Sequence, residues 1–256
     1  MSDLVLYRSQ GRLGTLTLNR PDSLNAISGE LMDQLLSRLR EAADDATTDV
    51  LIFRGEGRAF CAGADMKEIR EWTVDERRRH LGRLQDLTTR LWNMDKAVIA
   101  AIQGYAVGAG CELILNCDLR IAANDARFGF PETAIGAPIT NAGTKTLPAT
   151  IGLGRARELF YTGETIDASK ALNWGLVNRV VPRSELDAAA EAMANTILDK
   201  HQLAIRMNRH AVNFALGATV EQVLIHEAQD GMTAHAAGLV DQTRKSGDWG
   251  GTRRNR

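Results

Sequence analysis

One acidic residue, Glu112, lies inside an apolar stretch of the chain. Residues 97–118 have the sequence AVIAAIQGYAVGAGCELILNCD, a hydrophobic run broken by glycines, with Glu112 near its middle. Burying an ionised carboxylate is costly unless it is paired or its proton affinity rises. Such a glutamate is therefore either a proton-transfer group facing a pocket or a residue that only compensates the dipole of a helix start.

Two glycine-rich loops offer a second kind of chemistry. Twice a buried strand enters a Gly/Ala loop that opens a helix, in VLIFR…AFCAGADMKE (50–68) and in AVIAAI…AVGAGCELI (97–114). Small residues let a ligand approach the backbone closely, and a helix start presents unpaired N–H groups. Two such starts facing one point would stabilise an oxygen that becomes negative during a reaction. The alternative is two ordinary strand-to-helix turns of an α/β protein.

The periodicity of apolar residues predicts the elements that must position these groups. A helix over 29–43 begins at the cap Ser28 and places Leu31, Leu35, Leu39 and Ala42 on one face. Strands are predicted over 13–19, 50–54, 97–102 and 119–123. Helices are predicted over 66–71, 75–93, 111–117, 153–161, 167–173, 184–199, 202–216 and 219–235. The strands thus occupy the first two-thirds of the chain, and the last part is nearly all helical.

Composition excludes several classes of protein. The chain has 256 residues and a formal net charge of −1, so no overall basic field indicates nucleic acid or an anionic membrane. It lacks an apolar run of the ~18 residues that a membrane span needs, and its start, MSDLVLYRSQ, does not resemble a secretory signal or a transit peptide. We therefore expect a cytoplasmic protein.

Cysteine, histidine and glycine spacings argue against other sites. Cys61, Cys111 and Cys117 have no metal-like spacing and suit reduced thiols, and His226 and His235 lie nine positions apart, so no metal site is expected. The glycines of GYAVGAG do not follow the G-x-G-x-x-G pattern of dinucleotide-binding proteins, and no P-loop is present.

Several ordered segments together resemble the crotonase superfamily of enoyl-CoA hydratases and isomerases. These segments are LTLNRPDSLNAIS, AFCAGADMKE, IQGYAVGAGCELILNCDLRIAA, ARFGFPE and ELFYTGETIDASKALNWGLVNRVVP. The resemblance covers roughly residues 4–200. It implies an α/β fold, the ClpP-like crotonase spiral of ββα turns with two roughly perpendicular sheets and a helical C-terminal region. The implied division is a spiral core with the CoA-thioester site over 1–199 and a helical trimerisation region over 200–256.

The resemblance also assigns the catalytic groups. The family's oxyanion hole falls on the backbone N–H groups of Ala64 and Ala109, where GAG replaces the more usual GGG. The two catalytic carboxylates of hydratases fall on Glu112 and Glu132, which are 20 positions apart. Many relatives keep one of these acidic residues or neither. Which glutamate activates water and which protonates carbon is left open, and Glu132 remains open to being a surface carboxylate.

Recognition of coenzyme A follows from the resemblance as well. The segment AGADMK wraps the adenine and pantetheine in the family, which places Ala62, Asp65 and Met66 near that part of the substrate. Gly108 is expected to line the same site. Lys67 and Arg58 are either phosphate contacts or solvated surface cations. The run DERRRH (75–80) is expected to be a solvated helix face.

Two regions depart from the family pattern. The stretch 134–152, AIGAPITNAGTKTLPATIG, replaces LGxxPGxGGTQRL, and its Thr140 and Asn141 either bind a polar acyl group or only shape the loop. The familiar C-terminal sequence is also replaced. In the family these last helices build the trimer contact, so a homotrimer or a hexamer made of two trimers is expected.

The resulting functional prediction is a lyase of fatty acid metabolism that adds water reversibly to a 2-enoyl-CoA. No cofactor is implied, because coenzyme A enters as part of the substrate. One alternative is a double-bond isomerase of the same fold, in which a single glutamate moves a proton between C2 and C4. A second alternative is a non-catalytic relative that keeps the fold as a binding or assembly module.

Overall fold

The computed structural model describes residues 3–238. The chain divides after Leu198 into two compact units. Within the described residues, no helix combines the length and apolar character needed to cross a bilayer.

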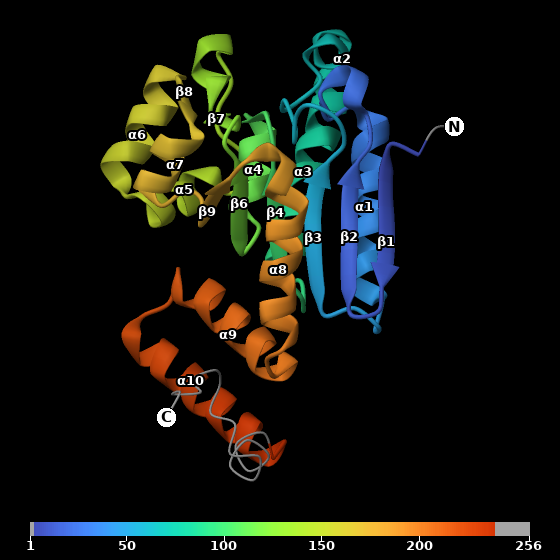
Figure 1. Cartoon of the computed structure of the whole chain (residues 1–256). Helices are drawn as coiled ribbons and strands as arrows, with labels where there is room; N and C mark the ends of the chain where they lie inside the picture. The colour runs from blue at the N-terminus through green and yellow to red at the C-terminus, as the bar shows by residue number, and fades with distance from the viewer. Residues whose placement is uncertain (1–2, 239–256) are drawn as a thin grey trace. The chain divides into compact units, whose positions relative to one another are not determined.

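The first unit is built on a sheet of six strands in the order β1-β2-β3-β4-β6-β9 (Figure 1). Its strands are β1 (Val5–Gln10), β2 (Leu13–Leu18), β3 (Val50–Gly55), β4 (Ala97–Ile102), β6 (Leu119–Ala123) and β9 (Arg179–Val181). Only the β1–β2 pair is antiparallel in this sheet; the other pairs are parallel. Strand β4 is buried at every position, as expected of a central strand covered on both faces.

A second, smaller sheet supports the functional loops. It contains β5 (Tyr105–Val107), β7 (Arg127–Gly129) and β8 (Thr165–Asp167) in the order β5-β7-β8. Strand β5 is parallel to β7, and β7 is antiparallel to β8. The sheet therefore holds the start of the 108–112 segment beside the segment that leads to Glu132.

Helices cover both faces of the large sheet. Figure 1 shows α1 (Gly29–Asp44) and α3 (Val74–Trp92) behind the sheet and α8 (Leu186–Leu198) in front of it. Helix α1 begins at Ser28, whose side chain accepts a hydrogen bond from the Leu31 amide, and it buries Leu31, Met32, Leu35, Leu39 and Ala42. The cap and buried face predicted for this helix are confirmed.

The remaining helices of the first unit are short. They are α2 (Met66–Glu71), α4 (Ala109–Leu115), α5 (Gly143–Ile151), α6 (Leu153–Thr162) and α7 (Ala168–Trp174). Three 3-10 segments occupy Pro21–Ser23, Pro131–Ile135 and Arg183–Glu185. All seven residues of α4 are buried, so Glu112 lies on a helix with no solvent-facing side.

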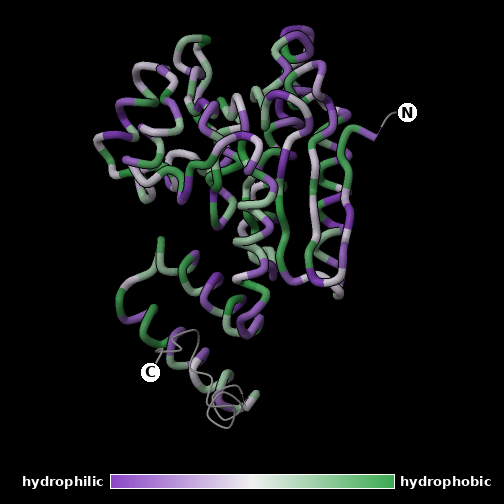
Figure 2. The backbone as a smooth tube through the Cα atoms, viewed as in Figure 1, coloured by the Kyte–Doolittle hydropathy of each residue, from purple (hydrophilic) through white to green (hydrophobic). Residues whose placement is uncertain are grey.

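The described part of the second unit consists of α9 (Gln202–Ala215) and α10 (Val220–Ala236). Thr219 and Gln222 form a reciprocal capping box at the start of α10. Figure 2 shows hydrophilic and hydrophobic residues alternating along both helices, as in amphipathic helices.

Most of the predicted helices and strands match the structure. The expected placement of all strands in the first two-thirds of the chain does not. Strand β9 (Arg179–Val181) lies in the last third of the chain, so the expected confinement of strands to the first two-thirds is wrong. Glu132 lies in the 3-10 segment Pro131–Ile135. A strand of three residues is too short to show the period-2 alternation that identifies strands in a sequence.

Candidate active site

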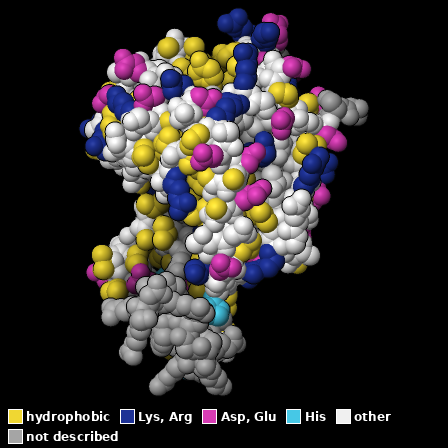
Figure 3. All heavy atoms as spheres, viewed as in Figure 1, with side chains coloured by type: hydrophobic (Ala, Val, Ile, Leu, Met, Phe, Trp, Pro, Cys, Tyr) yellow, Lys and Arg dark blue, Asp and Glu magenta, His cyan; other side chains and the backbone are white. Residues whose placement is uncertain are grey.

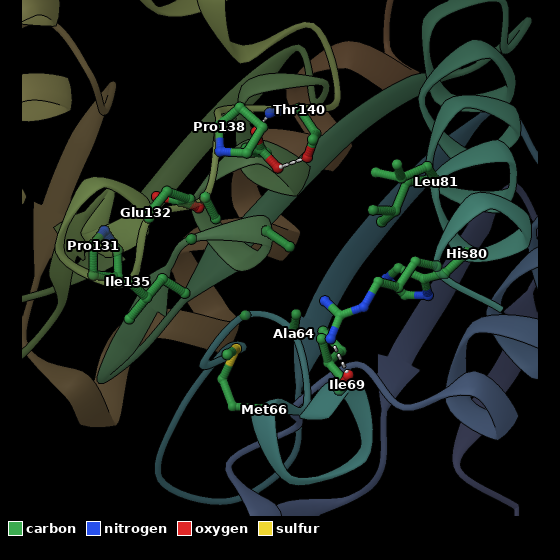
Figure 4. Close-up of a pocket in the computed structure, with 18 of the residues that line it drawn as sticks. Ala64, Met66, Ile69, His80, Leu81, Pro131, Glu132, Ile135, Pro138 and Thr140 are labelled. Atoms are coloured by element: carbon green, nitrogen blue, oxygen red, sulfur yellow. Dashed lines mark hydrogen bonds between the residues drawn. The ribbon is translucent and has the colours of Figure 1, made fainter. Parts of the chain in front are cut away.

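A cavity of about 430 Å³ brings together the segments singled out in the sequence. Its lining comes from the 62–66 loop, from α2 and α3, from the start of α4 and from residues 131–140. In Figure 4, Glu132 and Ile135 lie on one side of this pocket and His80 and Leu81 lie on the other, with Ala64 between them.

The two glycine-rich loops are joined directly. The Cys61 amide donates to the Tyr105 carbonyl at 2.9 Å, and the Val107 amide donates to the Cys61 carbonyl at 3.1 Å. A side chain at Gly110 would collide with that same Cys61 carbonyl. Glycine at position 110 therefore lets α4 pack against the first loop and fixes the distance between the two loops.

Two main-chain amides at the pocket have no hydrogen-bond acceptor within residues 3–238. Ala64 forms a parallel bridge with Ile27, but the hydrogen bonds of this bridge involve the residues on either side of Ala64. The Ile27 amide donates to the Gly63 carbonyl, and the Asp65 amide donates to the Ile27 carbonyl. The Ala64 amide consequently points away from Ile27. Ala109 is the first residue of α4, so its amide has no intrahelical acceptor.

The loops bring these two amides close to each other. A Cβ atom added to Gly63 would lie 3.5 Å from the Ala109 nitrogen and 3.7 Å from the Gly108 Cα. Both Ala64 and Ala109 line the cavity. Gly108 has φ +55° and ψ −130°, a conformation that essentially only glycine adopts, and this turn directs the Ala109 amide into the pocket. Two neighbouring N–H donors in this arrangement can bind one oxygen atom.

Glu112 is held by three hydrogen-bond donors from the divergent loop. Its side chain accepts from the Thr140 amide at 2.5 Å, from the Thr140 hydroxyl at 2.9 Å and from Asn141 Nδ2 at 2.9 Å. The residue is only 1% exposed. Burial raises the pKa of Glu112, and the donors of Thr140 and Asn141 act in the opposite direction by stabilising the carboxylate.

The loop reaches Glu112 through an unusual backbone conformation. Asn141 and Ala142 both have left-handed φ values, +46° and +60°. Non-glycine residues adopt this conformation at a cost, and such strain collects at functional sites. Asn116, the C-cap of α4, supports the turn by donating to the Asn141 carbonyl at 3.2 Å. Besides the two roles considered for Thr140 and Asn141, binding a polar acyl group or shaping the loop, the structure gives them a third one. They position Glu112.

Glu132 lies in a less polar setting. Its Oε2 atom is buried and has no hydrogen-bond partner within the described residues. Burial is the main cause, and the charge of Glu112 a further one, of a pKa raised to about 7. A Cβ atom added to Gly108 would lie 3.0 Å from Glu132 Oε1. The Glu132 carboxyl therefore lies against the turn that positions the Ala109 amide.

Not every residue predicted for the site lines the pocket. Ala62, Met66, Gly108 and Thr140 line it together with the four core residues Ala64, Ala109, Glu112 and Glu132. Asp65 and Lys67 are not among the lining residues.

Asp65 instead has a structural task. It caps α2 by accepting from the amides of Lys67 and Glu68, and its side chain forms a salt bridge of 2.6 Å with Arg20. Lys67 and Arg58 are exposed residues outside the pocket lining. The structure therefore gives neither cation a contact that distinguishes a phosphate site from a solvated surface.

Sequence reasoning missed part of the pocket wall. Trp72, Arg77 and His80 line the cavity, and His80 is only 6% exposed. The expectation that the whole run 75–80 is a solvated helix face is thus wrong for His80. The spacing of the buried residues Leu84, Leu87 and Leu91, continued towards the start of the helix, identifies His80 as a member of the inward face.

Comparisons with known proteins identify the family of the chain. The family model described as enoyl-CoA hydratase/isomerase matches residues 8–243. The chain is 34% identical to the short-chain-enoyl-CoA hydratase of Clostridium acetobutylicum over 88% of this chain and 87% of that protein. It is 35% identical to the 2,3-dehydroadipyl-CoA hydratase of Escherichia coli over 90% and 89% of the two chains.

A solved structure shows the same fold. The crystal structure of an enoyl-CoA hydratase from Bacillus anthracis superposes with a TM-score of 0.89 at 33% identity, covering 95% of this chain and 96% of that chain. Its architecture confirms the expected crotonase fold. The chain described here belongs to the enoyl-CoA hydratase/isomerase family, within the crotonase superfamily.

Proposed function

We propose that the protein is an enoyl-CoA hydratase that adds water reversibly across the 2,3 double bond of a 2-enoyl-CoA thioester. One observation carries the proposal: the carboxyl groups of the buried Glu112 and the half-buried Glu132 share a pocket with the available amides of Ala64 and Ala109. The two amides polarise the thioester, and the two carboxyl groups supply the base and acid that hydration requires.

The first step uses the two amides. The thioester carbonyl oxygen accepts hydrogen bonds from Ala64 and Ala109, which both line the pocket. Attack at C3 moves electrons onto this oxygen and forms an enolate. Amides already oriented towards the oxygen stabilise the new charge, and removal of one such donor typically costs ~3–4 kcal/mol of transition-state stabilisation.

Glu112 is the base in this proposal. A carboxylate has about four acceptor positions on its two oxygens, and donors from Thr140 and Asn141 occupy three of those on Glu112. These donors favour the ionised form and leave a position for a water molecule. Glu112 takes a proton from this water while the water oxygen bonds to C3.

Glu132 is the acid. Its pKa of about 7 keeps a large share of the group protonated at neutral pH, and its buried Oε2 makes no hydrogen bond to any residue that the structure describes. As the enolate collapses, Glu132 transfers its proton to C2. The product is a 3-hydroxyacyl-CoA, and a proton passing from Glu112 to Glu132 restores the starting state.

The substrate supplies coenzyme A, and the proposed reaction uses no other cofactor. Ala62 and Met66, at the edge of the pocket, are the proposed contacts for the CoA part. Relatives of nearly equal identity carry names that refer to different acyl groups, short-chain in one and 2,3-dehydroadipyl in another. Sequence identity therefore does not indicate which acyl group this protein accepts. The residues of the pocket wall have to determine that choice.

The proposed assembly is a homotrimer or a hexamer, in a cytoplasmic enzyme of fatty acid metabolism. Support for an assembly comes from large apolar side chains that the single chain leaves exposed on α10. These are Val220, Leu224, Ile225 and Met232, with exposed fractions between 59% and 70%. Exposed apolar groups of this size on one helix are typical of an interface.

Two substrates distinguish the proposal from its alternatives. The protein is incubated separately with a 2-enoyl-CoA and a 3-enoyl-CoA, and ultraviolet absorbance and mass spectrometry follow the conjugated thioester. A hydratase lowers the absorbance of the 2-enoyl ester and adds the mass of water. Conversion of the 3-enoyl ester to its 2-enoyl isomer without a mass change would instead identify an isomerase, and no change of either ester would identify a non-catalytic relative.

A further inference from the structure

Helix α3 forms the wall of the pocket that lies opposite Ile135. On this wall His80 and Leu84 are only 6% and 5% exposed, whereas Leu81 is 46% exposed and Arg77 is also exposed. Figure 4 shows Ile135 and His80 on opposite sides of the pocket. Ala62 and Met66 are the proposed contacts for coenzyme A. With coenzyme A at that edge, the acyl chain extends from the two glutamates towards the α3 wall.

The α3 wall contains a buried imidazole whose ring nitrogens bond to no other residue of the described part of the chain. Neither ring nitrogen of His80 has a hydrogen-bond partner within the described residues. The ring packs against Trp72 with centroids 4.6 Å apart, so its position is fixed by an aromatic neighbour. Buried polar atoms without partners are rare and costly, and an arriving ligand group would satisfy them.

A cation lies one helical turn away on the same wall. Arg77 lines the pocket, and its Nη2 donates to the Ile69 carbonyl on α2 at 2.9 Å. A guanidinium has five N–H donors, so this single bond anchors the group and leaves other donors available. Across residues 3–238, no salt bridge of Arg77 is recorded, whereas Arg78 pairs with Asp75 at 2.8 Å and Arg83 with Asp33 at 3.2 Å.

We infer that the α3 wall of the pocket recognises a carboxylate at the far end of the acyl chain, so that the substrate is a 2-enoyl-CoA of a dicarboxylic acid. Arg77 and His80 are the specificity-determining residues. This inference rests on the proposed function, because it takes the pocket as the acyl site of a CoA thioester.

A carboxylate fits this pair better than a neutral polar group does. The guanidinium offers charge and parallel donors that match a carboxylate. Burial and the charge of Arg83 lower the pKa of His80 to about 4, so the imidazole is neutral and offers one N–H donor at neutral pH. The carboxylates of Glu112 and Glu132 belong to the part of the pocket where C2 and C3 react, so they do not compete for this wall.

The test compares two esters of equal chain length, one ending in a methyl group and one in a carboxylate. A six-carbon 2-enoyl-CoA and its ω-carboxy counterpart serve as probes, and the ratio of their kcat/KM values is measured. We expect the carboxylate ester to be preferred by about tenfold to hundredfold, the range for a hydrogen bond to a charged group. Arg77→Met and His80→Leu should each remove most of this preference, mainly through the KM of the carboxylate ester.

Matched variants separate recognition from loss of folding. Arg78→Met changes the adjacent arginine, which is paired with Asp75 and lies outside the pocket lining, and it should leave the ratio unchanged. His80→Asn keeps a donor and should restore part of the preference that His80→Leu removes. A preference for the methyl ester, or equal effects of Arg77→Met on both esters, would overturn the inference while leaving the hydratase proposal intact.

Binding measurements cover the case in which neither ester is hydrated. Calorimetry with the two saturated acyl-CoA analogues of equal length compares affinity without turnover. Tighter binding of the ω-carboxy analogue that disappears in Arg77→Met would support the inference even if hydration failed. Equal binding of the two analogues would overturn it.

Discussion

At the scale of single residues, the site contains two glutamates with different surroundings. Glu112 accepts three hydrogen bonds, whereas the buried Oε2 of Glu132 accepts none from the described residues. In the proposed mechanism this difference makes Glu112 the base and Glu132 the acid. Because each charge affects the proton affinity of the other group, the two titrations are coupled.

The pH dependence of hydration tests these assignments. Glu132 has to be protonated to act as the acid, so kcat/KM should fall as the pH rises through about 7. Glu112 has to be ionised, and its raised pKa places the acid limb above the ordinary range of a glutamate. The residual activity of Glu132→Gln should lack the limb near pH 7. A profile of that variant identical in shape to the parent would contradict the assignment.

Thr140→Val tests the positioning of Glu112. The change removes the hydroxyl that donates to Glu112 Oε2 at 2.9 Å and keeps the backbone donor. With less stabilisation of the carboxylate, the pKa of Glu112 should rise, and the acid limb of the kcat/KM profile should move up by about one pH unit. Thr89→Val is the control, because the Thr89 hydroxyl bonds to the Gln85 carbonyl on α3, outside the pocket lining. An unmoved limb in Thr140→Val would remove Thr140 from this role.

The sequence predicted the glutamates and amides that the structure brings into one pocket, but not the hydrogen bonds that position them. Both glutamates and both amide positions came from the resemblance of ordered segments. The contact of Thr140 and Asn141 with Glu112 could not be predicted, because it spans 28 or 29 positions and depends on left-handed backbone at Asn141 and Ala142. His80 was missed because three adjacent arginines dominate the run in which it lies.

At the scale of elements, close packing of α4 against the first glycine loop sets the spacing of the two amides. The Gly110→Ala change adds a methyl group that collides with the Cys61 carbonyl. We expect a destabilisation of about 1–3 kcal/mol, the usual cost of overpacking, and a lower kcat because the Ala64 and Ala109 amides separate. Thermal unfolding and kcat check both effects.

Gly82→Ala is the matched control for this change. Gly82 lies inside α3, and a Cβ added there meets no heavy atom within 4 Å. Because alanine favours a helix more than glycine does, the variant should gain up to about 1 kcal/mol in stability. If Gly110→Ala matched Gly82→Ala in stability and kcat, the close approach of the two loops would have no functional role.

Element prediction succeeded where the apolar pattern is long enough to have a period. Helix α1 and strand β4 agree with the sequence pattern because their buried positions repeat at helical spacing or are continuously apolar. Strands β5, β7, β8 and β9 have three residues each and show no period. Helix α5 was missed because it begins at Gly143, contains Pro148 and has no side-chain cap.

At the scale of the whole molecule, the charges are balanced, and α10 carries several of the exposed apolar side chains. On the face shown in Figure 3, basic and acidic side chains are interspersed, in agreement with the net charge of −1. The exposed apolar residues of α10 are the proposed contacts between copies of the chain. A charged group in such an interface would have to be desolvated and would weaken association.

The proposed assembly gives a measurable mass. Light scattering after size exclusion should show three or six copies of the 28.0 kDa chain. Replacing Leu224 and Ile225, which are 59% and 60% exposed, by glutamate should shift the protein towards the single-chain mass. Val74→Glu, at a residue 72% exposed on α3, is the control and should leave the mass unchanged. A single-chain mass for the unmodified protein would contradict the assembly.

The most direct test of the proposed reaction is the kcat for hydration of a short-chain 2-enoyl-CoA by Glu112→Gln, Glu132→Gln and the double variant. Glutamine keeps the shape of each side chain but cannot take or give the proton. Each single change should lower kcat by about 10²–10⁴-fold, and the double variant should be little worse than the more damaging single one, because the two groups act as a unit. A single variant that hydrates the ester at the parent rate would contradict a mechanism with two carboxyl groups.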